Sequence, residues 1–229
     1  MRIAVLSDIH GNLPALDAAI EDLEREAPDE IWCAGDLGWA GGWASECIER
    51  VRSEGWTTVK GNTDVWISGD PQTVTSDGQR AEFEALAAAH SVSEDDANWL
   101  VNLPVGHTGA GSLLMVHGTP EGPFDAPMPG DPPERFAPYE DQATLVIYGH
   151  VHRAFVRRLA SGNLVCNPGS VGAPKDGPLG SYLLIERDSV HLTLRHKRFE
   201  FDREACLKRA EELTDPLREY FLKNLDFDG

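Results

Sequence analysis

Residues 1–11 read MRIAVLSDIHG, and this stretch sets the start of the fold. Its apolar run, Ile3–Leu6, has the length of a buried strand and leads into Asp8 and His10. A run this short cannot cross a bilayer or form the hydrophobic region of a signal peptide. We therefore expect a cytoplasmic protein whose first strand ends in two residue types that bind metals.

Strand and helix patterns alternate after this opening. The apolar spacing predicts helices over Leu13–Glu26 and Trp43–Glu54, and strands over Ile31–Ala34 and Thr57–Lys60. A βαβαβ beginning favours a parallel sheet with right-handed crossovers. Such sheets place their chemistry beyond the carboxyl ends of the strands.

The second half changes from helices to strands. Two helices are predicted first, over Glu82–Ala89 and Glu94–Val101. Turn residues at 161–163 and 187–189 predict antiparallel hairpins. The remaining predicted elements are strands over Leu113–Val116, Thr144–Tyr148, Phe155–Leu159, Leu164–Cys166, Tyr182–Ile185 and Val190–Leu194, a long loop with a short helical piece over Thr119–Pro138, and helices over Glu204–Leu213 and Leu217–Leu225. We expect one domain over residues 1–229, of the α/β class, in which two mixed sheets pack face to face with helices outside.

Composition limits the classes of function. The chain has 229 residues, of which 41% are hydrophobic, so it can bury a sizeable core. Its formal net charge of −18 disfavours nucleic-acid backbones and anionic membranes as partners, although bound divalent cations can still reverse the potential inside one cleft. The four cysteines are widely spaced, which predicts buried, reduced thiols rather than a zinc knuckle or disulfides: Cys33, Cys47, Cys166 and Cys206.

Metal-binding residue types recur at the ends of five predicted strands. A single Asp after a strand is usually a turn residue, and a lone His is usually not a ligand. Five strand ends that meet at one edge would instead bring carboxylates, imidazoles and a carboxamide together. These residues are Asp8 and His10, Asp36, Asn62, His117, and His150 with His152.

The same residues carry a resemblance to a known family. The blocks DIHGN (8–12), GD (35–36), GNTD (61–64), HG (117–118) and GHVH (149–152) resemble, in this order, those of the calcineurin-like metallophosphoesterases. The span from Asp8 to His152 covers about two-thirds of the chain. The run NPGSVG (167–172) is similar to the small bacterial and archaeal phosphodiesterase branch, although such a run is also an ordinary turn sequence.

The resemblance implies two divalent metal ions and a division of their ligands. It implies that Asp8, His10 and His152 hold one ion, that Asn62, His117 and His150 hold the other, and that Asp36 bridges both. It also implies hydrolysis of a phosphate ester by a metal-bridging hydroxide, with His10, Asn62 and His117 as catalytic residues and Asn12 and Thr63 as substrate-binding residues. Oxygen and imidazole donors without thiolate suit manganese best, with iron, zinc or nickel as alternatives.

Thr63 departs from the commonest form of the family, in which a histidine here is thought to protonate the leaving group. General-acid catalysis typically raises the rate ~10²–10⁴-fold. Without that acid, esters with good leaving groups such as nitrophenolate, which need no proton, are expected to react best. His10 or a metal-bound water could replace the missing acid. Asp64 is expected to support the ligands rather than to bind metal.

Other signals near these blocks are weaker. Trp39 and Trp43 could stack on a nucleobase, but packing is the simpler interpretation. The 119–138 loop, which leaves from His117, is equally consistent with a lid and an ordinary loop. The remaining histidines show no partner pattern and are not assigned to the site; they are His90, His107, His191 and His196.

These observations favour a metal-dependent phosphodiesterase acting on a small phosphate ester, with a nucleotide among the candidates. A phosphomonoesterase, including a protein phosphatase, is the nearest alternative. A non-catalytic interaction module on the same fold is the alternative of another class, and a complete ligand set argues against it. A DNA-processing nuclease is disfavoured by the acidic charge. Natural substrate, physiological metal and oligomeric state stay open.

Overall fold

The computed structural model describes residues 1–68 and 77–226, and the first strands form a mixed sheet. Strands β1, β2 and β3 run parallel to one another, while β9 is antiparallel to both β1 and β10. The order across the sheet is β10-β9-β1-β2-β3. The strands are β1 (Arg2–Leu6), β2 (Glu30–Cys33), β3 (Thr57–Thr58), β9 (Gly180–Arg187) and β10 (Leu192–Phe199).

A second five-stranded sheet has the order β4-β5-β6-β8-β7. Its three central strands β5, β6 and β8 are parallel, and an antiparallel strand closes each edge. The strands are β4 (Gly106–Gly109), β5 (Leu113–Val116), β6 (Leu145–Tyr148), β7 (Phe155–Arg158) and β8 (Leu164–Asn167). The predicted fold class, two mixed sheets flanked by helices, is confirmed.

The two sheets pack face to face, and side-chain alternation along β1 explains why. Ile3 and Val5 belong to the core between the sheets, together with Met115 and Ile147 of the second sheet. The residues between them, Ala4 and Leu6, point to the opposite face, where helices cover the sheet. A strand that is buried on both faces needs apolar residues at nearly every position, which explains the near-continuous apolar runs in the sequence.

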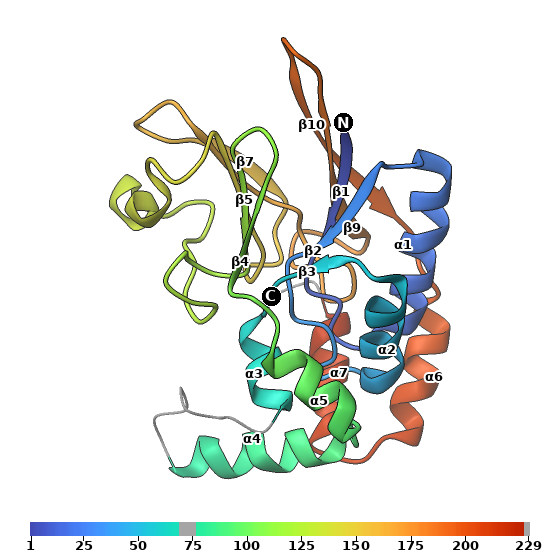
Figure 1. The fold of residues 1–229 in the computed structure, drawn as a ribbon. Helices are drawn as coiled ribbons and strands as arrows, with labels where there is room; N and C mark the ends of the chain where they lie inside the picture. The colour runs from blue at the N-terminus through green and yellow to red at the C-terminus, as the bar shows by residue number, and fades with distance from the viewer. Residues whose placement is uncertain (69–76, 227–229) are drawn as a thin grey trace.

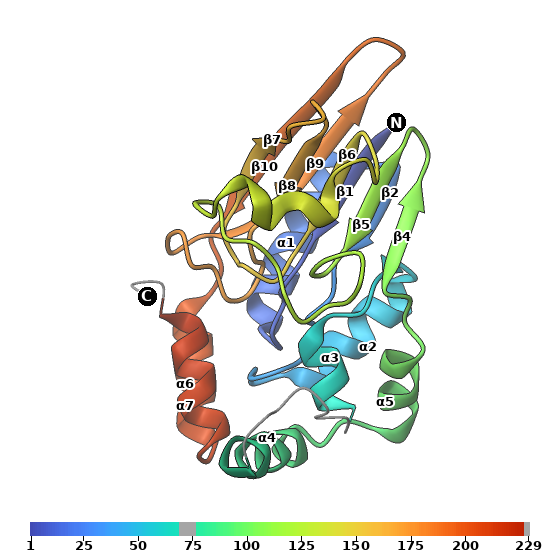
Figure 2. The same ribbon diagram turned by 90° about the vertical axis from the view of Figure 1, so that its left-hand side faces the viewer.

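Helices cover the outer faces (Figures 1 and 2). Helix α1 begins where the Asn12 side chain accepts a hydrogen bond from Ala15 N, and it buries Ala15, Leu16, Ala19 and Leu23 on one face. No helix within the described residues is both long and apolar enough to cross a membrane. The helices are α1 (Leu13–Glu26), α2 (Ala44–Glu54), α3 (Asn62–Ile67), α4 (Asp77–Ala89), α5 (Glu94–Val101), the 3₁₀ helix η1 (Pro133–Tyr139), α6 (Arg203–Glu212) and α7 (Leu217–Leu225).

The structure corrects several predicted elements. The strand expected over Thr57–Lys60 ends at Thr58, because Lys60 N turns away to donate to Pro104 O. The last strand begins at Leu192, which leaves Val190 exposed in the turn. Helix α3 and strand β4 were not predicted. Both hairpins were predicted correctly, and all four cysteines are buried and free, as expected.

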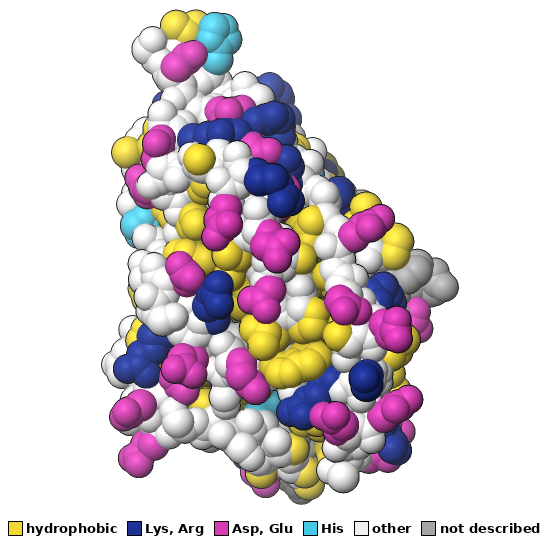
Figure 3. Space-filling model, turned by 90° about the vertical axis from the view of Figure 1, so that its right-hand side faces the viewer, with side chains coloured by type: hydrophobic (Ala, Val, Ile, Leu, Met, Phe, Trp, Pro, Cys, Tyr) yellow, Lys and Arg dark blue, Asp and Glu magenta, His cyan; other side chains and the backbone are white. Residues whose placement is uncertain are grey.

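Charges of both signs lie close together on the surface that carries α1 (Figure 3). Arg2 and Lys197 each pair with Glu26, and Arg195 pairs with Glu186. These basic side chains are therefore engaged by acidic neighbours. The Arg195–Glu186 pair is exposed on both sides, and pairs of that kind contribute little stability, typically ~0–1 kcal/mol.

Candidate metal centre

The seven residues predicted at strand ends meet at one edge of the two sheets. Asp8, Asp36 and Asn62 follow β1, β2 and β3, which are parallel neighbours, and His117 and His150 follow the parallel neighbours β5 and β6. Backbone hydrogen bonds tie the loops together: Asp8 N donates to Gly35 O, and Gly149 N donates to His117 O, each at 3.0 Å.

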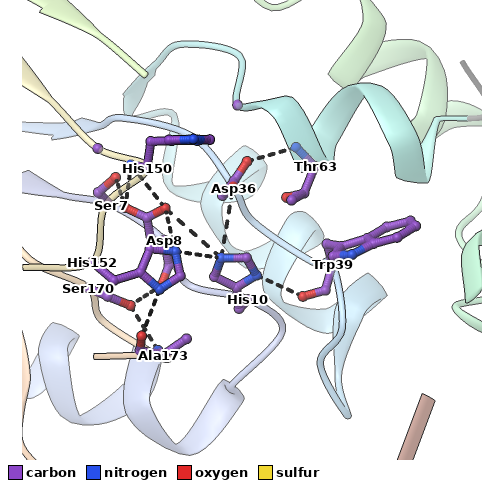
Figure 4. A network of polar contacts seen from close by, with 12 residues as sticks. Ser7, Asp8, His10, Asp36, Trp39, Thr63, His150, His152, Ser170 and Ala173 are labelled. Atoms are coloured by element: carbon purple, nitrogen blue, oxygen red, sulfur yellow. Dashed lines mark hydrogen bonds and ion pairs between the residues drawn. The ribbon is translucent and has the colours of Figure 1, made fainter. Parts of the chain in front are cut away.

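The first group consists of Asp8, His10, Asp36 and His152. One donor atom of each lies within 4.8 Å of the others, and Figure 4 shows the four side chains pointing toward one another. His152 Nε2 is 3.2 Å from Asp8 Oδ1 and 3.2 Å from His10 Nε2. Three of the four residues are buried, so little of their donor capacity is used by solvent.

The second group consists of Asn62, His117 and His150. Asn62 Oδ1 lies 3.0 Å from His117 Nε2 and 2.8 Å from His150 Nδ1. Asp36 stands between the groups, because its Oδ2 is 3.4 Å from His117 Nε2 and 3.6 Å from His10 Nε2. One carboxylate oxygen therefore faces both sets of donors.

Backbone carbonyls require a hydrogen on Nδ1 of three imidazoles. The Nδ1 atoms of His10, His117 and His152 face Trp39 O, Ala34 O and Ala173 O at 2.9, 2.6 and 2.7 Å. A neutral ring that donates from Nδ1 leaves a lone pair on Nε2. The Nε2 atoms of His10 and His152 then face each other at 3.2 Å with no hydrogen to share, which only a cation or an added proton satisfies. The donor set thus fits a metal site, and the outer carbonyls orient it as in known sites.

The backbone at the cluster adopts a conformation that side chains rarely take. Asp8, His10, Asp36, His150 and His152 all have φ between +49° and +70°. Such residues cost free energy and gather at functional sites, where the surrounding structure holds them. Five of the seven candidate ligands share this property. Local backbone preference disfavours the conformation, so the surrounding structure must hold these side chains in place.

Comparison with known proteins agrees with this geometry. The family model for the calcineurin-like phosphoesterase superfamily domain matches residues 1–189. The chain belongs to this family. The predicted resemblance is confirmed, and the family makes the chain a phosphoesterase.

Individual relatives of this phosphoesterase cover almost the whole chain. A metallophosphoesterase from Sphaerobacter thermophilus is 26% identical, with a TM-score of 0.75 over 98% of this chain and 100% of that one. A hypothetical protein from Pyrococcus horikoshii shares the fold, with 20% identity and a TM-score of 0.76 over 96% of this chain and 97% of that one. An uncharacterised protein of Methanocaldococcus jannaschii is 27% identical over 92% of this chain and 90% of its own length.

The carboxylates of the phosphoesterase are held as anions. Burial alone would raise the pKa of Asp8 and of Asp36, but nearby imidazoles, His152 and His117 respectively, hold both pKa values below the usual range. Asp8 Oδ2 accepts from Ser7 Oγ at 2.6 Å, and His150 N donates to Oδ2 and Oδ1 of Asp8 at 3.1 and 3.3 Å. Asp36 Oδ1 accepts from Thr63 N at 2.9 Å. Asp8 Oδ1 and Asp36 Oδ2 are the oxygens that face the imidazoles of the cluster.

Asp64 shapes the loop that carries Asp36. Its carboxylate accepts hydrogen bonds from Asp36 N and Leu37 N at 2.9 Å and from Gly61 N at 2.8 Å. Burial and the neighbouring Asp36 charge raise the pKa of Asp64 to about 6. The side chain points at backbone donors rather than at the imidazoles, in keeping with the supporting role that was expected.

The 167–172 run, which is similar to the phosphodiesterase branch, supports the ligands from the back. Ser170 Oγ donates to Asp8 O at 2.7 Å, and Gly172 N donates to the same carbonyl at 3.1 Å. Asn167 Nδ2 donates to Gly149 O at 2.5 Å, beside His150. Ser170 was missed because it lies 162 positions from Asp8, and no local pattern signals such a contact. Ser7 directly precedes Asp8 and was missed because nothing in the sequence marks its hydroxyl as a partner of that carboxylate.

The predicted substrate-binding residues occupy different places. The Asn12 side chain is buried, donates to Gly172 O and accepts from Ala15 N, so the structure does not bring it into the cluster. Thr63 lies beside Asp36, and its buried Oγ1 has no hydrogen-bond partner among the described residues (Figure 4). Trp39 packs against Trp66 and Phe83 and is only 4% exposed, which confirms the packing interpretation.

The loop after His117 is anchored at several points. Tyr139 Oη donates to Gly118 O at 2.9 Å, and Tyr148 Oη donates to Pro127 O at 2.8 Å. Asp125 and Arg135 form a two-bond ion pair across the loop. These contacts tie the loop to η1 and β6 in this structure.

Proposed function

We propose that this phosphoesterase hydrolyses phosphodiester bonds of a small molecule or nucleotide with two divalent metal ions. The observation that carries the proposal is the position of Asp36, whose Oδ2 faces both donor groups at 3.4 and 3.6 Å. Asp8, His10 and His152 would hold one ion and Asn62, His117 and His150 the other, with manganese as the expected metal. The ions would supply Lewis acidity toward the phosphoryl oxygens and a water of lowered pKa.

The chain's own residues position the substrate around these ions. His10, Asn62 and His117 are held by backbone contacts on their far sides or by one another, so their donor atoms are preorganised. The Thr63 hydroxyl, which has no hydrogen-bond partner among the described residues, would bond a phosphoryl or leaving-group oxygen. A buried hydroxyl without a partner is costly, and a substrate oxygen would satisfy it.

Thr63 also supports a preference among esters. A threonine hydroxyl is a much weaker acid than an imidazolium ion, so it can donate a hydrogen bond but transfers a proton poorly. Esters with good leaving groups are therefore favoured. The two carboxylates of the donor groups, Asp8 and Asp36, would also repel the single negative charge of a diester less than the double charge of a monoester.

The test compares two esters on one metal-loaded protein. We expect protein stripped with chelator and reloaded with manganese to hydrolyse bis-p-nitrophenyl phosphate faster than p-nitrophenyl phosphate. His117→Ala should abolish both activities, whereas His191→Ala, which removes an imidazole that is 77% exposed, should leave them unchanged. Turnover of the monoester alone would contradict the phosphodiesterase proposal and indicate a phosphomonoesterase. Metal binding without turnover of either ester would favour the interaction module.

A further inference from the structure

A buried histidine outside the cluster is connected to it through a single peptide group. His90 follows α4 and is 7% exposed. Its Nε2 accepts a hydrogen bond from Ala40 N at 3.0 Å. The carbonyl of the same peptide, Trp39 O, lies 2.9 Å from Nδ1 of the candidate ligand His10. The 39–40 peptide thus links His90 to His10 directly.

The protonation state of His90 suits this role. Burial, with a smaller electrostatic contribution from the nearby His10, lowers the pKa of His90 to about 4. The ring is therefore neutral near pH 7, and because Nε2 accepts from Ala40 N–H, the hydrogen must sit on Nδ1. That Nδ1 is buried and has no partner among the described residues. Among the described residues, the bond from Ala40 N is thus the one hydrogen bond that orients the His90 ring.

The backbone at Ala40 does not hold this peptide by itself. Ala40 has φ +59°, in the left-handed region that disfavours residues with a Cβ atom. The Trp39 ring fixes one side of the peptide by packing 5.6 Å from the His90 ring. The hydrogen bond from Ala40 N fixes the other side. Without it, the Trp39 carbonyl would be free to rotate away from His10.

We propose that His90 is a positioning residue of the metal centre, which acts by holding the 39–40 peptide so that Trp39 O keeps His10 in its Nδ1–H form. His10 Nε2 then faces Asp8 and Asp36 as a lone-pair donor. Successive hydrogen bonds through one peptide also polarise each other, which strengthens the donor character of Nε2. This inference rests on the proposed metal centre, and its test reads metal affinity rather than activity.

The test compares three variants by calorimetric titration of chelator-stripped protein with Mn²⁺. His90→Phe keeps a ring but removes the acceptor, and we expect it to weaken Mn²⁺ binding about tenfold, the lower range for outer-shell partners. His90→Gln restores an acceptor near the position of Nε2 and should recover most of the affinity. Phe83→Leu is the matched control, because Phe83 also packs on the Trp39 ring, at 5.5 Å, without bonding the peptide. Its affinity should stay close to that of the unmodified protein.

The outcomes separate this inference from the proposed function. Unmodified protein that binds no Mn²⁺ contradicts the metal centre itself. Normal binding by His90→Phe, or equal weakening in His90→Gln or Phe83→Leu, overturns the role of His90 alone. If His90→Phe does not fold, ¹H–¹⁵N correlation NMR of the imidazoles in the unmodified protein provides the test. We expect His90 to carry its proton on Nδ1. A proton on Nε2 would overturn the inference.

Discussion

Asp36→Asn is expected to lower diester hydrolysis about a thousandfold. The change keeps the shape of the side chain but removes the negative charge that faces both donor groups. If the amide oxygen keeps its bond to Thr63 N, the new NH₂ group points at the His10 and His117 nitrogens and repels a cation. Metal ions typically lower the reaction barrier by several kcal/mol. Because each ~1.4 kcal/mol corresponds to a factor of ten in rate, losing most of this effect gives about a thousandfold decrease.

The measurement is kcat/KM for bis-p-nitrophenyl phosphate at saturating manganese, together with the metal content of the purified protein. Asp17→Asn serves as the control, since it removes the same charge from a side chain that is half exposed on α1. It should keep full activity. An Asp36→Asn protein that keeps more than about a tenth of the activity would contradict a shared carboxylate ligand.

Gly61→Ala is expected to disable the site with little change of fold. Gly61 has φ −88° and ψ 167°, a conformation open to any residue, so only contacts oppose a side chain there. An added Cβ would lie 2.1 Å from Asp36 Oδ1 and 2.4 Å from Asp36 N. Asp36 would have to move, and we expect activity to fall at least ~100-fold, as misplacement of a catalytic group by about 1 Å does.

The free energy of unfolding of the Gly61→Ala protein should fall only modestly, whereas its activity is largely lost. Overpacking a close contact typically costs ~1–3 kcal/mol, measurable by urea unfolding of stripped protein. Gly122→Ala is the matched control, because an added Cβ there meets no atom within 4 Å. Gly61→Ala with normal metal binding and turnover would show that the position of Asp36 is not critical.

Long periodic elements were predictable because their patterns are local. The bounds Leu13–Glu26, Glu94–Val101 and Leu217–Leu225 agree with helices α1, α5 and α7. Helix α3 was missed because six residues are too few to show periodicity, although Asp64 caps its start by accepting from Gly61 N. Strand β4, with glycine at both ends, has almost no apolar signal.

The candidate ligands were predictable because each lies within a few residues of the end of an apolar strand. Their supports were not, because the contacts come from tertiary packing: Ser170 reaches Asp8 across 162 positions, and His90 reaches Ala40 across 50. His90 has no spacing relation to any ligand and was set aside on that ground. Asn12 was assigned to substrate from its motif, whereas its side chain caps α1.

The number of bound ions tests the two-metal centre most directly. We predict two manganese ions per chain by plasma emission spectrometry of reloaded, dialysed protein. In the double variant His117→Ala/His150→Ala we predict one, because Asp8, His10, Asp36 and His152 still form a complete donor group. Unmodified protein that retains no metal, or a double variant that retains two ions, would contradict the proposed division of ligands.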